Sequence, residues 1–160
     1  MAHILKPPAP LDGLTAPTVF LAGSIEMGRA EDWQAAVSRS LQSEDIVILN
    51  PRRDDWDPTW AQHMDNPPFR EQVEWELAAQ ERATLIVMYF APSTQSPISL
   101  LELGLFARSQ KLVVCCPEGF WRKGNVDIVC DRYNVPMVDD LDGLGAAIRQ
   151  QLTNQPNEIN

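Results

Sequence analysis

The sequence has few of the residues on which metal centres and histidine-based catalytic sites depend. Its 160 residues include two histidines, His3 and His63, and three cysteines, of which Cys115 and Cys116 are adjacent. Zinc ligands are usually spaced apart along a chain, and a catalytic triad needs a histidine beside its nucleophile. His3 falls in an expected terminal arm, and we expect His63 at the surface of a polar loop. We therefore expect no metal site and no chemistry that depends on histidine.

The cysteines and the apolar runs also bear on where the protein works. An odd number of cysteines, with Cys115 and Cys116 inside one apolar run, is typical of buried thiols and not of a disulfide framework. The amino terminus lacks the pattern of a secretory signal, so a reducing cytoplasm is the expected location. No apolar run approaches the roughly 20 residues of a membrane-spanning helix, and we expect no membrane partner.

Positive charge is scarce as well. The chain has 13 basic and 22 acidic residues, which gives a formal net charge of −9. Proteins that hold nucleic acid through its phosphates need a basic surface, so we expect no nucleic acid polymer as a partner. The length suits one domain with a sizeable core. We expect residues 1–160 to form a single domain, with a proline-rich, irregular arm at 1–16 and a frayed tail at 153–160.

What the sequence does contain is a regular alternation of apolar runs and amphipathic segments. Strands are expected at 18–22, 45–49, 83–90, 112–116 and 135–138, and helices at 29–41, 69–81, 96–107, 125–133 and 141–152. Continuous apolar runs are typical of parallel strands that are buried on both faces. The alternation predicts an α/β fold with a doubly wound, five-stranded parallel sheet and helices on both faces. In such sheets ligands bind beyond the carboxyl ends of the strands.

The helix expected at 96–107 contains a single carboxylate in an apolar sequence. Ile98 and Phe106 lie four residues before and after Glu102, so we expect the carboxylate to share their buried face. An unpaired buried carboxylate is costly and must be paired, protonated or solvated in a pocket. Two interpretations follow: Glu102 forms a structural ion pair with an arginine, or it is held at the edge of the sheet for chemistry.

A second carboxylate, Glu76, lies beside Val73 and Leu77 on the expected helix 69–81. One interpretation is a partly exposed charge at the rim of the sheet. The other places Glu76 near Glu102, where two carboxyls in different environments can divide into a nucleophile and a proton donor. That division of roles suits cleavage of a glycosidic bond.

Several polar residues follow the expected strands and are candidates for the same edge. Gly23 and Ser24 end the first strand, where backbone amides and a hydroxyl suit an anion or a sugar, although many such turns are only tight connections. Asn125 and Asp127 follow the fourth strand and are weaker candidates.

The segment 50–68 is too long for a plain connection in a compact domain, which favours a functional loop. It carries Trp56 and Trp60. An exposed tryptophan can stack on a flat base, or it can pin the loop to the body of the protein.

Four short motifs together point to a family. They are Phe20-Leu21-Ala22-Gly23-Ser24-Ile25 with the following Gly28-Arg29, then Asn50-Pro51-Arg52-Arg53, Trp75-Glu76-Leu77 and Leu101-Glu102-Leu103-Gly104. From about Thr18 to Val138 the chain resembles the nucleoside 2-deoxyribosyltransferase family and the related hydrolases of deoxynucleoside 5′-monophosphates. The resemblance implies a flavodoxin-like fold, no cofactor or metal, and a homodimer or higher homo-oligomer in which a neighbour helps to close the site.

The resemblance also implies roles for individual residues. Glu102 matches the catalytic glutamate that attacks the anomeric carbon and forms a deoxyribosyl ester. Glu76 falls where the transferases carry an aspartate that assists at the base. Gly23, Ser24 and Ile25 match the strand end that lines the nucleoside pocket. The expected partners are a small-molecule nucleoside or nucleotide and a free nucleobase.

Ser96 departs from the transferase pattern. Six residues before the catalytic glutamate, the transferases carry an aspartate that holds the sugar 5′-hydroxyl, whereas the related hydrolases have a serine that contacts the 5′-phosphate. A serine hydroxyl can donate to a phosphate that an aspartate would repel. However, Pro97 and Ile98 replace the glycine-containing run of those hydrolases. The expected substrate-binding residues are Gly23, Ser24, Ile25, Trp56, Ser96, Ser99, Asn125 and Asp127.

Three functions therefore remain open from the sequence. The first is transfer of deoxyribose between bases through Glu102, with Glu76 assisting. The second is hydrolysis of deoxynucleosides or of their 5′-monophosphates. The third, of another class, is a nucleotide-binding module without turnover, which the altered 96–98 segment would explain.

Overall fold

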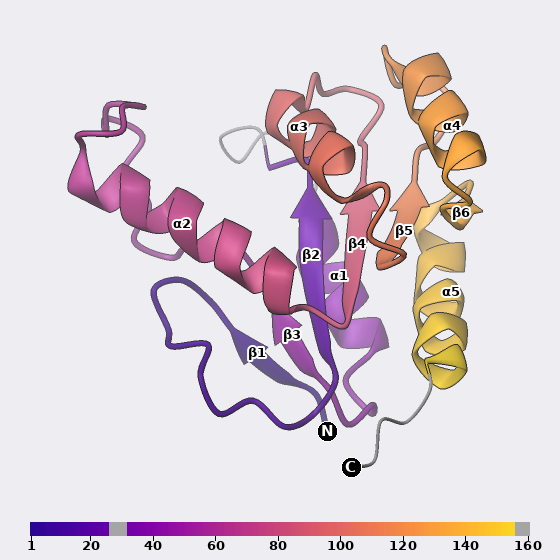
Figure 1. Ribbon diagram of the computed structural model, residues 1–160, viewed down its shortest axis with the longest axis horizontal. Helices are drawn as coiled ribbons and strands as arrows, with labels where there is room; N and C mark the ends of the chain where they lie inside the picture. Colours follow the sequence, from indigo (N-terminus) through magenta and orange to yellow (C-terminus); the bar gives the residue numbers. More distant parts are fainter. Residues whose placement is uncertain (26–31, 156–160) are drawn as a thin grey trace.

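The computed structural model describes residues 1–25 and 32–155, and they form a sheet of six parallel strands with helices on both faces (Figure 1). The strands are β1 (His3–Leu5), β2 (Thr18–Gly23), β3 (Val47–Leu49), β4 (Leu85–Tyr89), β5 (Leu112–Cys115) and β6 (Met137–Val138). Their order is β1-β3-β2-β4-β5-β6, and every neighbouring pair is parallel. Without β1 this is the flavodoxin-like order, so the predicted fold class is confirmed, with one strand more than expected.

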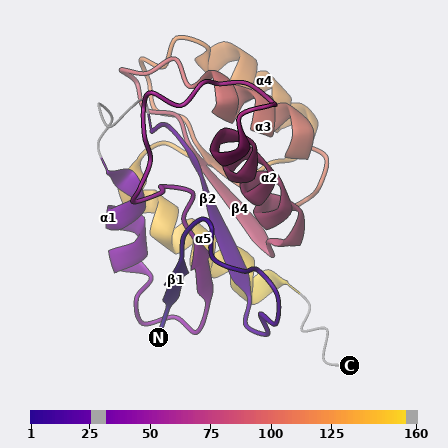
Figure 2. The same cartoon turned by 90° about the vertical axis from the view of Figure 1, so that its left-hand side faces the viewer.

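The sixth strand, β1, lies in the segment that was expected to be an irregular arm. His3–Leu5 pairs in register with Val47–Leu49 of β3. The rest of the arm lies below α2 in Figure 2, and Trp75 Nε1 of α2 donates to the carbonyl of Ala9 at 2.8 Å. A strand of three residues beside several prolines has too little periodicity to be recognised, and its partner strand supplies the hydrogen bonds that define it.

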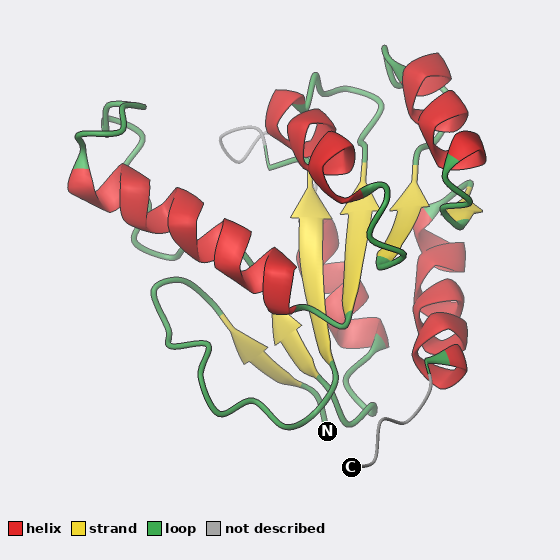
Figure 3. Cartoon of the chain, viewed as in Figure 1, coloured by secondary structure: helices red, strands yellow, loops and turns green. Residues whose placement is uncertain are grey.

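Helices of the described residues cover both faces of the sheet (Figure 3). They are α1 (Trp33–Ser40), α2 (Pro67–Arg82), α3 (Pro97–Phe106), α4 (Lys123–Arg132) and α5 (Leu141–Asn154). α2, α3 and α4 pack on one face, while α1 and α5 pack on the other. The expected start of the first helix at Arg29 lies outside the described residues. α5 extends into the expected tail as far as Asn154. None of the described helices is long and apolar enough to cross a membrane.

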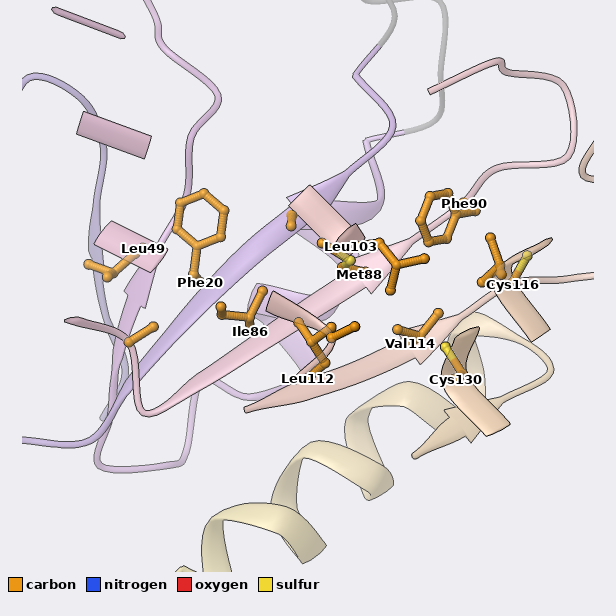
Figure 4. Close-up of a cluster of buried hydrophobic side chains, with 14 of the residues drawn as sticks. Phe20, Leu49, Ile86, Met88, Phe90, Leu103, Leu112, Val114, Cys116 and Cys130 are labelled. Atoms are coloured by element: carbon orange, nitrogen blue, oxygen red, sulfur yellow. The ribbon is translucent and has the colours of Figure 1, made fainter. Parts of the chain in front are cut away.

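Alternating strand residues divide between two hydrophobic cores. Ile86 and Met88 of β4 point into the core beneath α2, α3 and α4, which Figure 4 shows. Leu85 and Val87 point into the core beneath α1 and α5. The cysteines of β5 and α4 are buried, unpaired thiols, as the sequence predicts, and burial raises the pKa of Cys115 to about 12.

The chain changes direction between β2 and β4, which are neighbours in the sheet. From β2 it passes through α1 to β3 on one side, and from β3 it crosses back through α2 to β4 on the other side. Ligands of doubly wound sheets bind at such a point, beyond the carboxyl ends of the strands. Gly23 ends β2 there with φ +145°, and a Cβ on it would lie 2.5 Å from the carbonyl oxygen of Tyr89. Only glycine allows this close approach.

Candidate active site

The orientation of α3 differs from the expectation and brings its carboxylate inward. Glu102 is 7% exposed, but Ile98, Leu101 and Leu105 are 59%, 60% and 56% exposed. The prediction that Glu102 shares a buried face with Ile98 is therefore wrong, because helical periodicity shows that residues share a face but not what covers that face. The buried side of α3 consists of Ser99, Glu102 and Leu103.

A cluster of hydroxyls fixes the start of α3 against the end of β2. Ser96, in the left-handed conformation at φ 48°, precedes Pro97 and hydrogen-bonds Ser24 and Thr94 through its buried hydroxyl. Ser24 also contacts Thr94 at 2.9 Å and accepts from the amide of Ala91 at 3.0 Å. The cluster joins the ends of β2 and β4 to α3. Sequence reasoning missed Thr94, since no pattern marks it.

Two glutamines of α2 flank Glu76 at intervals of four residues, on one face of the helix. Gln72 Nε2 donates to Glu76 Oε1 at 2.8 Å and to the carbonyl of Pro51 at 2.9 Å. Gln80 Nε2 donates to the carbonyl of Glu76 at 3.2 Å, and its side-chain amide hydrogen-bonds the carboxylate of Glu102. The sequence analysis overlooked both glutamines, although their spacing from Glu76 is a usable signal.

Burial changes the acidity of both carboxyls. Loss of solvation raises the pKa of Glu76 to about 7, and the hydrogen bond from Gln72 partly opposes the shift. Loss of solvation, followed by the charge of Glu76, raises the pKa of Glu102 to about 8, against the hydrogen bond from Gln80. The ion pairs of residues 1–25 and 32–155 include neither carboxyl, so the arginine partner considered for Glu102 is not found there. Two such interacting carboxyls titrate as a pair that keeps one proton near neutral pH.

The other residues expected near the first strand lie at this edge. Gly23 pairs with Tyr89 of β4, and Ser24 is buried in the hydroxyl cluster. Ser99 is 3% exposed on the buried side of α3 that carries Glu102. Ile25 is half-buried and is the last described residue before 26–31. The Gly28-Arg29 motif lies outside the described residues.

Trp56 packs within its own loop. Its ring meets Trp60 edge to face at 5.0 Å, and the guanidinium of Arg53 lies 5.2 Å from the Trp60 ring centre. Arg53 also contacts Asp55 at 2.6 Å and Glu71 of α2 at 2.7 Å. Arg53 therefore joins the loop to α2 through Glu71, and the two tryptophans pack beside it. His63 is exposed there, as expected.

Asn125 and Asp127 lie on α4, and the contacts described for them do not involve the carboxyl pair. Asn125 is exposed, and Asp127 pairs with Lys123 at 3.1 Å. Lys123 also donates to the carbonyl of Cys116 at 3.1 Å, at the end of β5. The contacts therefore join Glu76 with Glu102 and Ser24 with Ser96, and α3 carries Ser96 at its start and Ser99 and Glu102 on its buried side. The contacts described for Trp56, Asn125 and Asp127 do not connect them to these residues.

Comparison with known families gives a match over most of the chain. The family model described as nucleoside 2-deoxyribosyltransferase like matches residues 16–120, well over half of the chain. The match spans β2 to β5 and includes both carboxyls, but it ends before α4. No curated protein sequence matches the chain. The chain belongs to the nucleoside 2-deoxyribosyltransferase-like family.

Proposed function

We propose that the protein cleaves the N-glycosidic bond of 2′-deoxynucleosides and passes the deoxyribosyl group to another nucleobase. The observation that carries the proposal is the buried pair of Glu76 and Glu102, each hydrogen-bonded by a glutamine of α2 at the carboxyl edge of the sheet. Two carboxyls that share one proton can act as nucleophile and proton donor at a glycosidic bond.

The reaction proceeds in two displacements at C1′ of the sugar. Burial leaves the higher pKa on Glu102, so the reactive form is the less populated one in which Glu76 holds the proton and Glu102 is ionised. In that form the Glu102 carboxylate attacks C1′, the bond from C1′ to the base nitrogen breaks, and a deoxyribosyl ester of Glu102 forms. The departing base keeps the electron pair and takes a proton from Glu76 or from water. A nitrogen of the acceptor base then attacks C1′, the ester breaks and Glu102 returns as a carboxylate, while the acceptor gives its proton to Glu76. Two displacements retain the configuration at C1′.

The substrate is the nucleoside without a 5′-phosphate. The serine at position 96 made a phosphate contact worth considering, but its hydroxyl is buried and hydrogen-bonded to Ser24 and Thr94. A phosphate would have to displace these hydrogen bonds. Hydrolysis remains the second candidate, since water can replace the acceptor base at the ester.

The active form is a homodimer in which α3 meets α3 of a second copy. Ile98, Leu101 and Leu105 expose apolar side chains, and Glu102, the one charged residue of α3, is turned inward. Two such surfaces bring apolar groups together without burying an unpaired charge, as a twofold interface requires. The free thiols of Cys115, Cys116 and Cys130 support a location in the reducing cytoplasm.

The test is chromatography of the purified protein with a panel of deoxynucleosides and one free acceptor base. We expect a new deoxynucleoside to appear, and intact-mass measurement without acceptor to reveal one deoxyribosyl group on the wild type but none on Glu102→Gln. A free base released without any new nucleoside would support hydrolysis instead. Ligand-induced thermal stabilisation without any product would leave only the nucleotide-binding module. The 5′-monophosphate, assayed in parallel, should be the poorer substrate.

A further inference from the structure

Seven buried side-chain atoms lack hydrogen bonds within the part of the chain that the structure describes, and four of them belong to Arg52, which follows β3, and to Gln34 of α1. These four are Nε and Nη2 of Arg52 and both amide atoms of Gln34. Gln34 is 0% exposed, and the side chain of Arg52 is 25% exposed. Buried donors and acceptors nearly always have partners, so unsatisfied groups point to a ligand or ordered water.

Arg52 follows the carboxyl end of β3, and Gln34 lies in the first turn of α1, the helix between β2 and β3. Arg52 Nε is 3.8 Å from Oδ1 of Asp32, which caps α1 through the amide of Ala35 at 3.0 Å. Gln34 follows two residues after Asp32 in the first turn of α1. The adjoining Pro51 accepts a hydrogen bond from Gln72, the same amide that binds Glu76.

The orientation of α1 places Gln34 on the same flank as Arg52. The Trp33 ring packs on Tyr89 of β4 at 5.5 Å, and the carbonyl of Ser40 accepts from Arg149 of α5. Gln34 is about 100° around the helix from Trp33 and lies on the flank away from α5, toward β3.

The two unsatisfied nitrogens of Arg52 lie on one edge of its guanidinium. Nε and Nη2 present parallel N–H groups, which bind two adjacent acceptors in a bidentate pair. Such a pair is the commonest specific contact to O6 and N7 of guanine. Asp32 balances the arginine charge nearby, so a neutral ligand with two acceptors suits this edge better than an anion does.

We infer that Arg52 and Gln34 read the base of the substrate and select a 6-oxopurine, that is, hypoxanthine or guanine. N7 and O6 accept from Arg52, and N1–H donates to the carbonyl oxygen of the Gln34 amide, whose NH₂ group donates to O6. Adenine presents a donor at position 6 and an acceptor at position 1, which reverses this pattern. The inference rests on the proposed function, because it takes the side of Glu76 as the base side.

The same contacts assist departure of the base. When the C1′–N9 bond breaks, the electron pair spreads over the purine ring, including N7 and O6. Hydrogen bonds from a guanidinium to these atoms strengthen as that charge develops, which stabilises the transition state. Arg52 therefore affects both the choice of base and the rate at which it leaves.

The test compares deoxyinosine with deoxyadenosine as donors in wild type, Arg52→Lys and Arg53→Lys. We expect the wild type to favour deoxyinosine in kcat/KM and Arg52→Lys to reduce that ratio roughly 10- to 100-fold, the discrimination of one bidentate pair. Arg53→Lys is the matched control, because Arg53 is the neighbouring arginine and joins its loop to α2. This variant should keep the wild-type ratio of kcat/KM for deoxyinosine to that for deoxyadenosine. 7-Deaza-2′-deoxyguanosine, which lacks the N7 acceptor, should be a poorer donor than deoxyguanosine.

Calorimetric binding of free hypoxanthine and free adenine provides a readout without turnover. We expect hypoxanthine to bind more tightly to the wild type, and Gln34→Leu to reduce the difference while keeping or raising Tm, because two unsatisfied polar atoms are removed. A wild-type preference for adenine or a pyrimidine, or an unchanged ratio in Arg52→Lys, would overturn the inference alone. Selective hypoxanthine binding without cleavage of any deoxynucleoside would instead overturn the proposed function.

Discussion

Helices α3 and α5 pack on opposite faces of one sheet and use their apolar residues in opposite ways. In α5, Leu144 and Ile148 are 0% exposed and lie in the core, and Asp140 caps the helix through the amide of Gly143 at 2.8 Å. In α3, Leu101 is 60% exposed, whereas Glu102 is buried. α5 follows the usual pattern of an amphipathic helix, and α3 inverts it.

The difference separates a helix that stabilises the fold from a helix that carries the site. A buried carboxylate destabilises the folded chain, and the proposed catalytic role accounts for a glutamate at a position where a leucine would be more stable. The exposed leucines of α3 cost little in the single chain and are available to a second copy. We therefore propose that α5 serves stability, that the inner face of α3 serves catalysis and that its outer face serves assembly.

The largest expected effect is on catalysis by Glu102→Ala. Without the carboxylate no ester can form, and we expect kcat for base exchange to fall by at least roughly 10³-fold, as in other enzymes that lose a nucleophile. The far-ultraviolet circular dichroism should match the wild type, since α3 keeps Leu103 in the core. Turnover at the wild-type rate would exclude Glu102 as the nucleophile.

The next effect is on stability, from Ile148→Ala in α5. Its side chain is fully buried between the sheet and α1, and its truncation leaves a cavity. We expect the free energy of unfolding in urea to fall by about 2–5 kcal/mol, with kcat unchanged at a temperature where the variant is folded. A loss below about 1 kcal/mol would show that α5 is not the stabilising helix of the pair.

The sequence predicts the strands and helices of this protein better than it predicts which of their faces are buried. Apolar runs identified the four central strands β2, β3, β4 and β5, whose residues are almost all buried, and also the short edge strand β6. The same criterion failed for α3, where Ile98 and Leu105 form an apolar stripe that faces solvent in the single chain. Periodicity gives a shared face, and only the tertiary structure shows whether the chain itself covers it.

The candidate site was predicted in part for a similar reason. Glu102 stands out because it is the one charge in an apolar helix, and Glu76 because it lies near an apolar stripe. Gln72 and Gln80 carry no charge and resemble ordinary surface residues until the fold places them beside the carboxyls. Arg52 was noticed only within a motif, since its unsatisfied edge exists only after α1 and β3 are packed together.

A smaller effect is the pH dependence of stability in Glu102→Gln. Since burial raises the pKa of Glu102 to about 8, its contribution to stability is full below its ordinary pKa of 4.5 and is lost as the pH rises through about 8. The amide does not ionise, so the Tm of Glu102→Gln should exceed that of the wild type by more at pH 8 than at pH 5. Each unit of pKa shift corresponds to about 1.4 kcal/mol.

Scanning calorimetry across this pH range measures the difference. Glu74→Gln, which changes a carboxylate that is 62% exposed on α2, controls for the loss of one negative charge. If the Tm difference between Glu102→Gln and the wild type is the same over the whole pH range, burial does not raise the pKa of Glu102.

The smallest effect on the single chain is expected from Leu101→Ala on the outer face of α3. Its side chain is largely solvated in one copy, so the free energy of unfolding at high dilution should change by less than about 0.5 kcal/mol. At higher concentration the same substitution should shift the sedimentation velocity profile from dimer to monomer, because it removes apolar contact at the proposed twofold interface. Met64→Ala, which alters a side chain that is 68% exposed in the 50–66 loop, should leave the profile unchanged. If the wild type is a monomer at every concentration, the exposed leucines of α3 have no partner. The outer face of α3 would then not serve assembly, and the proposed difference in role between α3 and α5 would fail.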